Sequence, residues 1–152
     1  MKNLGTVTLE TERLILRKTR QNDAEQMFRN WANNERVTKY MTWPPYESVE
    51  QLETTYHKFL LDNQGKPDFY DWKIELKDSC EPIGAISVVQ LRENIEAATI
   101  GYCLGYNWWH KGIMSEAFRE IIRFLFEDVG LNRIEAYHDP RNPHSGDVMK
   151  KR

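Results

Sequence analysis

The chain has 152 residues, a length that suits one domain able to bury roughly two thirds of the surface exposed by its unfolded form. Its 21 basic and 23 acidic residues leave a net charge of −2, so the bulk charge indicates neither a nucleic-acid nor a membrane partner. The start of the chain lacks the apolar core of a signal peptide, and no run of about 18 apolar residues occurs, which predicts a cytoplasmic protein.

The first part of the chain predicts a strand followed by two helices. Residues 11–19 alternate between apolar and polar side chains in their middle, as in a half-buried strand. Asp23 and Gln26 have the spacing of a capping box, which marks a helix start. Ser48 and Gln51 repeat that signal before a second segment with helical apolar spacing.

The middle of the chain predicts three strands, at residues 69–77, 83–91 and 98–106. The connections between them are short, which favours an antiparallel meander. Gly101 and Gly105 lie in the third strand, where glycine often marks a bulge or a close backbone approach. In the first strand, charged residues alternate with apolar ones and are expected to form a solvent-exposed face: Asp71, Lys73, Glu75 and Lys77.

The longest regular pattern predicts a helix over residues 113–129 that packs on a sheet, with Gly130 ending it. A strand at 133–139 should follow, parallel to the preceding strand because a helix connects them. Asn142 then caps a short helix that occupies the remaining residues. This order predicts an α/β (α+β) fold, a mixed central sheet flanked by helices, in one domain covering residues 1–152.

The segment NWWHKGIMSEAF, residues 107–118, is the strongest indication of a binding site. A helix start leaves several backbone N–H groups without partners and carries a partial positive charge, which together suit an anion such as phosphate. Gly112 would let the backbone approach a ligand closely, and His110 and Lys111 would add donors or charge. The alternative is that the glycine serves only the turn while the aromatic residues pack.

Other phosphate and metal motifs do not fit the sequence. A Walker loop requires GxxxxGK[ST] and a Rossmann fingerprint requires GxGxxG between parallel strands, and neither pattern occurs. Cys80 and Cys103 match neither a disulfide framework nor paired metal-ligand spacing. We therefore interpret both as ordinary thiols and expect no metal site.

Three segments together resemble a known family: TERLILR, IGYCLG leading into WWHKGIMSEA, and RIEAYHDPRNPHS. They are similar to the GNAT superfamily of acetyl-CoA-dependent N-acetyltransferases, and within it to the branch of ribosomal-protein N-terminal (alanine) acetyltransferases. The resemblance extends from Thr11 to the final residue, in matching order and spacing. It implies a GNAT-type acyl-CoA N-acyltransferase fold with acetyl-CoA as cosubstrate. It also implies direct attack on the thioester by a primary amine, from a protein N-terminus or a small molecule.

The resemblance also implies where CoA binds. The family's pyrophosphate signature, an Arg or Gln, two residues, Gly, one residue, then Gly or Ala, falls on six consecutive positions: Trp109, His110, Lys111, Gly112, Ile113 and Met114. The first and last positions depart from the signature, but the family binds here mainly through backbone N–H groups. Leu104 in the preceding strand would offer backbone groups to the pantetheine arm. Asn142 would hydrogen-bond the same arm, a role compatible with a helix cap.

The family's catalytic base is altered in this chain. Many relatives carry a glutamate two residues before the glycine of the central strand, where this chain has Thr99. Glu96 is a candidate base, with a solvated turn residue as the alternative interpretation. His138 is a reserve candidate that could relay a proton through water, although it could equally be structural. An α-amine has a pKa of about 8 and needs little help to lose its proton, so weak base machinery favours α-amines.

The family's acid for the departing thiolate is altered as well. Numerous relatives use a tyrosine seven residues after the asparagine, where this chain has Met149, which has no proton to give. The ribosomal-protein branch places a serine three residues after the asparagine, and Ser145 matches that position. Ser145 is therefore the candidate acid, with a first-turn helix residue as the alternative.

The chain ends early relative to the family, whose members continue into two further strands. We therefore expect the strand at 133–139 to expose an edge, either in a shortened enzyme or under a partner chain such as a second copy. The rival function is a catalytically impaired acyl-CoA-binding protein, suggested by Thr99, Met149 and the short end. A third interpretation, an interaction domain, rests on the aromatic segment YMTWPPYES at 40–48, which better suits a wall of the acceptor site.

Overall fold

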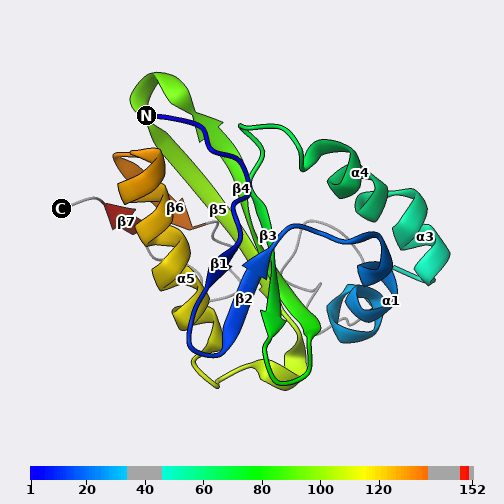
Figure 1. Cartoon of the computed structure of the whole chain (residues 1–152). Helices are drawn as coiled ribbons and strands as arrows, with labels where there is room; N and C mark the ends of the chain where they lie inside the picture. The colour runs from blue at the N-terminus through cyan, green and yellow to red at the C-terminus, as the bar shows by residue number, and fades with distance from the viewer. Residues whose placement is uncertain (34–45, 137–147, 151–152) are drawn as a thin grey trace.

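The computed structural model describes residues 1–33, 46–136 and 148–150. Within these residues, seven strands form one sheet in chain order, and all neighbours are antiparallel except the parallel pair β5 and β6. This mixed sheet confirms the predicted meander and the parallel return after the long helix (Figure 1). The strands are β1 (Leu9–Glu10), β2 (Leu14–Arg17), β3 (Asp71–Leu76), β4 (Glu81–Arg92), β5 (Ala97–Leu104), β6 (Arg133–Ala136) and β7 (Val148–Lys150).

Helices cover both faces of the sheet, with α5 on one side and α1, α3 and α4 on the other (Figure 1). The larger apolar core lies between α5 and the sheet, and the smaller one lies among the other three helices. The helices are α1 (Ala24–Met27), which continues as a π-helical turn (Phe28–Ala32), α3 (Val49–Thr54), α4 (Tyr56–Asn63) and α5 (Ile113–Arg123), which continues as a π-helical turn (Phe124–Val129).

Local signals placed most helix ends correctly. The Ser48 hydroxyl accepts a hydrogen bond from the Gln51 N–H at 3.0 Å, as expected of a cap. Gly130 has φ +88°, and its N–H donates to the Leu125 carbonyl at 3.0 Å, which confirms the predicted helix end. The predicted start at Asp23 is confirmed, since α1 begins at Ala24 with Asp23 at the Ncap position. The Asp23 side chain does not cap α1, because it accepts from the Arg20 N–H at 2.7 Å and closes a 3-10 turn before the helix.

The prediction of a solvent-exposed face on β3 is wrong. Asp71, Lys73 and Glu75 keep only 2%, 0% and 4% of their surface exposed, because α1, α3 and α4 cover this side of the sheet. The buried charges are paired, as burial requires. Lys73 bonds Asp71, and the Arg17 guanidinium donates to Glu75 and Asp23 at 2.8 Å each.

The prediction for the end of the chain is also wrong. β7 pairs antiparallel with β6, so the final residues include a strand where a helix was expected. The structure therefore contains one of the two further strands expected to be missing. Because β7 covers the free side of β6, the argument for a partner chain at that edge no longer holds.

Candidate functional site

The site is built on the turn between β5 and α5, where the backbone is unusually constrained. Gly105 lies beneath Trp108, and a Cβ at this position would approach the indole ring to 2.6 Å and the Asn30 carbonyl oxygen to 2.8 Å. This contact confirms the close backbone approach predicted for that glycine. His110 and Gly112 both have positive φ, +63° and +73°, so the chain reverses tightly before the helix.

Trp109 holds the turn against the end of the strand. Its indole N–H donates to the Leu104 carbonyl at 2.8 Å, and its ring packs edge-on against Tyr106 with centroids 5.0 Å apart. The carbonyl of Leu104, one of the predicted pantetheine contacts, therefore already accepts a hydrogen bond within the protein. Trp109 therefore stabilises the turn by joining it to the end of β5.

The N-terminus of α5 has no cap from its own Ncap residue, because that residue is Gly112. In an α-helix the first N–H groups have no intrahelical acceptor, and here they belong to residues that include Ile113 and Met114. They combine with the helix dipole to favour an anion. Lys111 and Gly112 are both exposed, so a ligand can reach this point from solvent.

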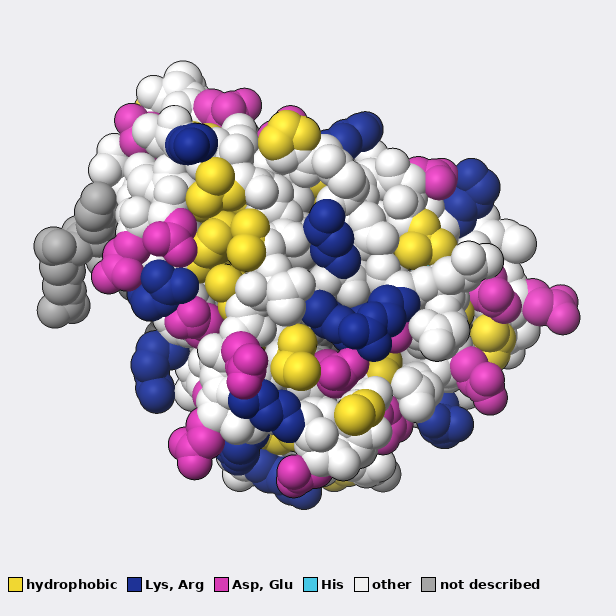
Figure 2. All heavy atoms as spheres, in the orientation of Figure 1, with side chains coloured by type: hydrophobic (Ala, Val, Ile, Leu, Met, Phe, Trp, Pro, Cys, Tyr) yellow, Lys and Arg dark blue, Asp and Glu magenta, His cyan; other side chains and the backbone are white. Residues whose placement is uncertain are grey.

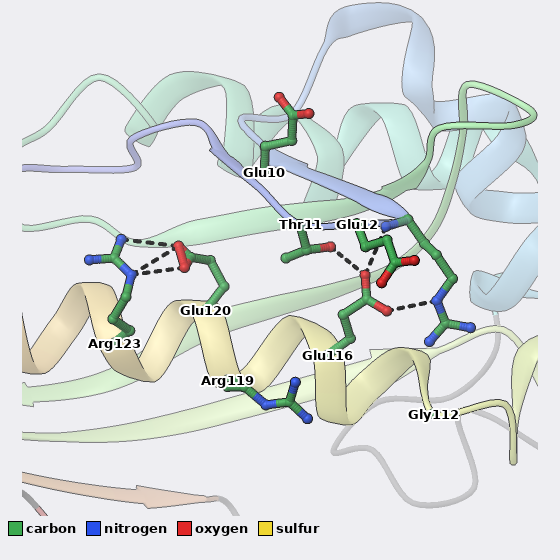
Figure 3. A pocket seen from close by; sticks show the side chains of 9 residues that line it. Glu10, Thr11, Glu12, Gly112, Glu116, Arg119, Glu120 and Arg123 are labelled. Carbon is green, nitrogen blue, oxygen red and sulfur yellow. Dashed lines mark hydrogen bonds and ion pairs between the residues drawn. The ribbon is translucent and has the colours of Figure 1, made fainter.

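Glu116 lies in the first turn of α5, where its negative charge could oppose an anion. Its carboxylate instead faces the segment after β1: it accepts from the Thr11 hydroxyl and, at 2.7 Å, from Arg13 Nε (Figure 3). Burial alone would raise the pKa of Glu116, but the hydrogen bonds from Thr11 and Arg13 outweigh it and lower the pKa. The charge of Glu116 is therefore compensated, and Arg13 Nη1 also donates to the Lys111 carbonyl at 3.2 Å.

An open pocket of about 480 Å³ runs between residues 10–13 and the exposed side of α5, beginning at Gly112 (Figure 3). Both acidic and basic side chains line the pocket, and several of them form ion pairs with each other. Arg123 binds Glu120 at 2.8 Å, and Glu116 binds Arg13. Acidic and basic side chains are likewise interspersed on the face of the molecule shown in Figure 2. The pocket therefore borders the helix start but does not by itself select a ligand.

Next to this helix start, one side of strand β5 has no described strand beside it. It pairs with β4 along its length, whereas β6 accompanies it only from Ala97 to Ile100. From Gly101 to Leu104, no described strand lies on the β6 side. An extended ligand containing amide groups could pair there with the backbone, in the same way as a neighbouring strand.

The remaining predicted residues fall in three places. Glu96 lies at the start of β5, opposite the end that leads to Gly112, and its carboxylate is 3.6 Å from the Met1 amine. The structure thus agrees with the turn alternative for Glu96 and does not bring it to the helix start. Thr99 lies between these ends, on a partly exposed part of β5. His138, Asn142 and Ser145 lie outside the described residues, as does most of the aromatic segment at 40–48.

Sequence reasoning did not find Arg13 and Glu116 as parts of the site. An acidic residue in a helix's first turn is visible in the sequence, but its partner lies 103 positions earlier in the chain. No spacing rule connects residues that far apart. Within the described ranges, no helix is long and apolar enough to cross a membrane, and no group of His, Cys, Asp and Glu could hold a metal ion.

A family model described as the acetyltransferase (GNAT) domain matches residues 13–152. The chain belongs to the GNAT acetyltransferase family. This membership confirms the resemblance drawn from the sequence and identifies the protein as an enzyme of the acetyltransferase class. The seven-stranded mixed sheet with helices on both faces is its version of the GNAT fold.

Named relatives of this GNAT acetyltransferase agree with that assignment. The chain is 37% identical over 139 residues to the uncharacterized N-acetyltransferase p20 of Bacillus licheniformis, and the alignment covers 91% of this chain and 76% of that protein. It is 30% identical over 161 residues to the ribosomal protein uS5-alanine N-acetyltransferase of Escherichia coli (strain K12), covering 98% and 78%. Microcin C7 self immunity acetyltransferase MccE, solved in complex with acetyl-CoA and AMP, shares the fold with a TM-score of 0.68 and 23% identity, covering 83% and 69%.

Proposed function

We propose that this GNAT acetyltransferase binds acetyl-CoA and transfers the acetyl group to a primary amine, on a protein N-terminus or a small molecule. The observation that carries the proposal is the side of β5 from Gly101 to Leu104 along which no described strand lies, which leads directly to a start of α5 that its Ncap residue does not cap. An extended arm with two amides and a terminal pyrophosphate matches these two features in order. The name of the Escherichia coli relative supports a protein N-terminus as the acceptor.

The residues at the helix start would bind the pyrophosphate mainly through the backbone. The N–H groups around Gly112, Ile113 and Met114 would donate to phosphate oxygens, with Lys111 and His110 beside them. Trp109 would form a wall, and the Leu104 N–H would serve the pantetheine arm. In the same proposal, Asn142 binds that arm and Ser145 protonates the CoA thiolate. The enzyme would act as a cytoplasmic protein.

The proposed reaction is a direct transfer. The nitrogen lone pair of a neutral amine attacks the thioester carbonyl, the C–S bond breaks, and the CoA thiolate takes up a proton while the nitrogen loses one. Cys103 is a poor alternative nucleophile, because burial raises the pKa of its thiol to about 12. An acetyl-cysteine intermediate is therefore disfavoured.

Release of free thiol from acetyl-CoA, measured over a panel of amines and N-terminal peptides, tests the proposal. Turnover with at least one acceptor is expected. Acetyl-CoA binding without turnover on every acceptor would instead support the impaired acyl-CoA-binding protein, which Thr99 and Met149 favour.

Gly112→Glu tests the position of the CoA site. The new carboxylate would face the pyrophosphate, and a side chain at φ +73° would strain the turn, so the CoA dissociation constant should rise at least about 10-fold. Gly65→Glu is the matched control, because a side chain at Gly65 meets nothing within 4 Å. Gly130→Glu is the control for backbone strain, because Gly130 also has a positive φ but lies at the other end of the helix. Unchanged CoA affinity in Gly112→Glu would refute the assigned position.

A further inference from the structure

A glutamate that the sequence patterns did not single out lies beside Thr99 on the neighbouring strand. In the parallel ladder of β5 and β6, Thr99 is the Cα partner of Glu135, and Ala98 is the partner of Ile134. Ala98 and Ile134 both belong to the core under α5. Since successive strand residues point to opposite faces, Thr99 and Glu135 share the face away from α5.

Glu135 lies near the end of the described part of the ladder, next to Ala136, the last described residue of β6. The last pair of the ladder is Ile100 with Ala136, one residue beyond Glu135. Five residues of strand separate Thr99 from Leu104, about 17 Å at about 3.3 Å per residue. A pantetheine arm that enters at Leu104 and runs along β5 on the side away from β4 would bring its thioester toward the level of Thr99 and Glu135.

The two carboxylate oxygens of Glu135 differ in their described contacts. Arg133, two residues earlier on the same face, contacts Oε1, and no described residue donates to Oε2. The side chain keeps 28% of its surface exposed. Among the described residues, Asp71 is a second carboxylate near this level, through the register from Asp71 to Ser87 to Gly101. Asp71 is 2% exposed and is committed to Lys73, so it is a poor proton acceptor for a ligand.

We propose that Glu135 is a catalytic residue that hydrogen-bonds the acceptor amine and accepts its proton, directly or through one water. The inference rests on the proposed amine acetylation. As the C–N bond forms, the nitrogen becomes more acidic and its proton passes to Oε2 of Glu135. The C–S bond then breaks, the CoA thiolate takes a proton from the acid on its own side, and Glu135 returns its proton to solvent. Thr99 cannot accept this proton, whereas a carboxylate on the next strand can.

The test compares kcat/KM for amine acetylation in the wild type and Glu135→Gln from pH 6 to pH 10. Loss of the base should lower kcat/KM about 100-fold at pH 7, mostly through kcat. The difference should shrink toward pH 10, where hydroxide increasingly takes the nitrogen proton in place of Glu135. The acetyl-CoA dissociation constant should stay unchanged, and Glu135→Asp should retain part of the activity because it keeps a carboxylate.

Arg133→Gln is the matched control, because it removes the ion pair of Glu135 but keeps the carboxylate. It should lower kcat/KM no more than about threefold at any pH, since a partly exposed ion pair contributes little. An equal loss in both variants, without a change of pH profile in Glu135→Gln, would show a structural role and overturn the inference. If Glu135→Gln turned over the acceptor as fast as the wild type does, the inference about Glu135 would be overturned and the proposed function would stand. A wild type that binds acetyl-CoA but turns over no acceptor would overturn the proposed function together with it.

Discussion

At the scale of single residues, the two cysteines show how position determines reactivity. Cys80 is exposed in the turn before β4, whereas Cys103 lies in β5 against the cluster of buried side chains under α1, α3 and α4. Burial raises the pKa of the Cys103 thiol to about 12, although Lys73 opposes that rise. At pH 8 the Cys103 thiol therefore stays protonated.

Alkylation checks this difference. Iodoacetamide at pH 8 should label Cys80 in the native protein and leave Cys103 unmodified until the protein is denatured, because the thiolate is the reactive form. Peptide mass spectrometry locates the label, and Cys80→Ala should give an unlabelled native protein. Labelling of Cys103 at a rate similar to that of Cys80 would contradict the raised pKa.

At the scale of elements, α5 is attached to the N-terminal segment through the same turn that forms the candidate anion site. Glu116 accepts from the Thr11 hydroxyl, the Arg13 N–H and Arg13 Nε, and Arg13 also donates to the Lys111 carbonyl. The start of the helix is therefore positioned by residues 11–13, which are remote in the chain. This attachment holds the nearby carboxylate of Glu116 away from the first N–H groups of α5, which have no acceptor within the helix.

Glu116→Gln should lower the free energy of unfolding by about 1 to 2 kcal/mol at pH 7, because hydrogen bonds to a charged group are lost. The pKa of Glu116 is lowered in the folded state, so its stabilising effect is present above the unfolded pKa of about 4.3 and is lost as pH falls through the lower folded value. Urea unfolding should therefore show the variant and the wild type converging below about pH 4.

The control for Glu116→Gln is Glu127→Gln, on the exposed far part of the same helical segment. Its contact with Arg123, at 3.3 Å, is an exposed ion pair, so its loss should change stability by no more than about 0.5 kcal/mol. Equal stability of Glu116→Gln and the wild type at pH 7 would show that residues 11–13 do not hold the helix start.

At the scale of the whole molecule, the sheet separates two different interiors. The α5 side is an apolar core, whereas the opposite side contains the ion pairs of Arg17, Lys73 and Glu75 beneath α1, α3 and α4. The proposed CoA arm would run from the start of α5 toward Glu135, along the side of β5 that faces away from β4. The acceptor would then approach from the face that carries Thr99 and Glu135.

Ligand binding should therefore stabilise the whole fold. Acetyl-CoA at 100 times its dissociation constant should add about 2.7 kcal/mol to the free energy of unfolding, with a corresponding rise in Tm. Differential scanning calorimetry measures this rise, and Gly65→Glu should show it as well as the wild type. If Gly112→Glu showed the same rise at the same concentration, the pyrophosphate would bind elsewhere.

Much of this architecture follows from local sequence. The period of two in β3, the apolar stripe of α5, the cap at Ser48 and the left-handed glycine at 130 each depend on residues a few positions apart. The glycine before α5 and the motifs around it likewise identified the family. These features were predictable because backbone geometry and short-range hydrogen bonds determine them.

Only the tertiary structure decided the rest. It buried Asp71, Lys73 and Glu75 under three helices, placed β7 along β6, joined Arg13 to Glu116 and set Glu135 beside Thr99. An alternating strand has the same pattern whether its polar face meets water or a second layer of paired charges. The side chain opposite Thr99 depends on the register between strands whose residues are far apart in sequence. Local sequence therefore determined the family and the helix start at Gly112, whereas long-range packing decided which carboxylate lies beside the proposed reaction site.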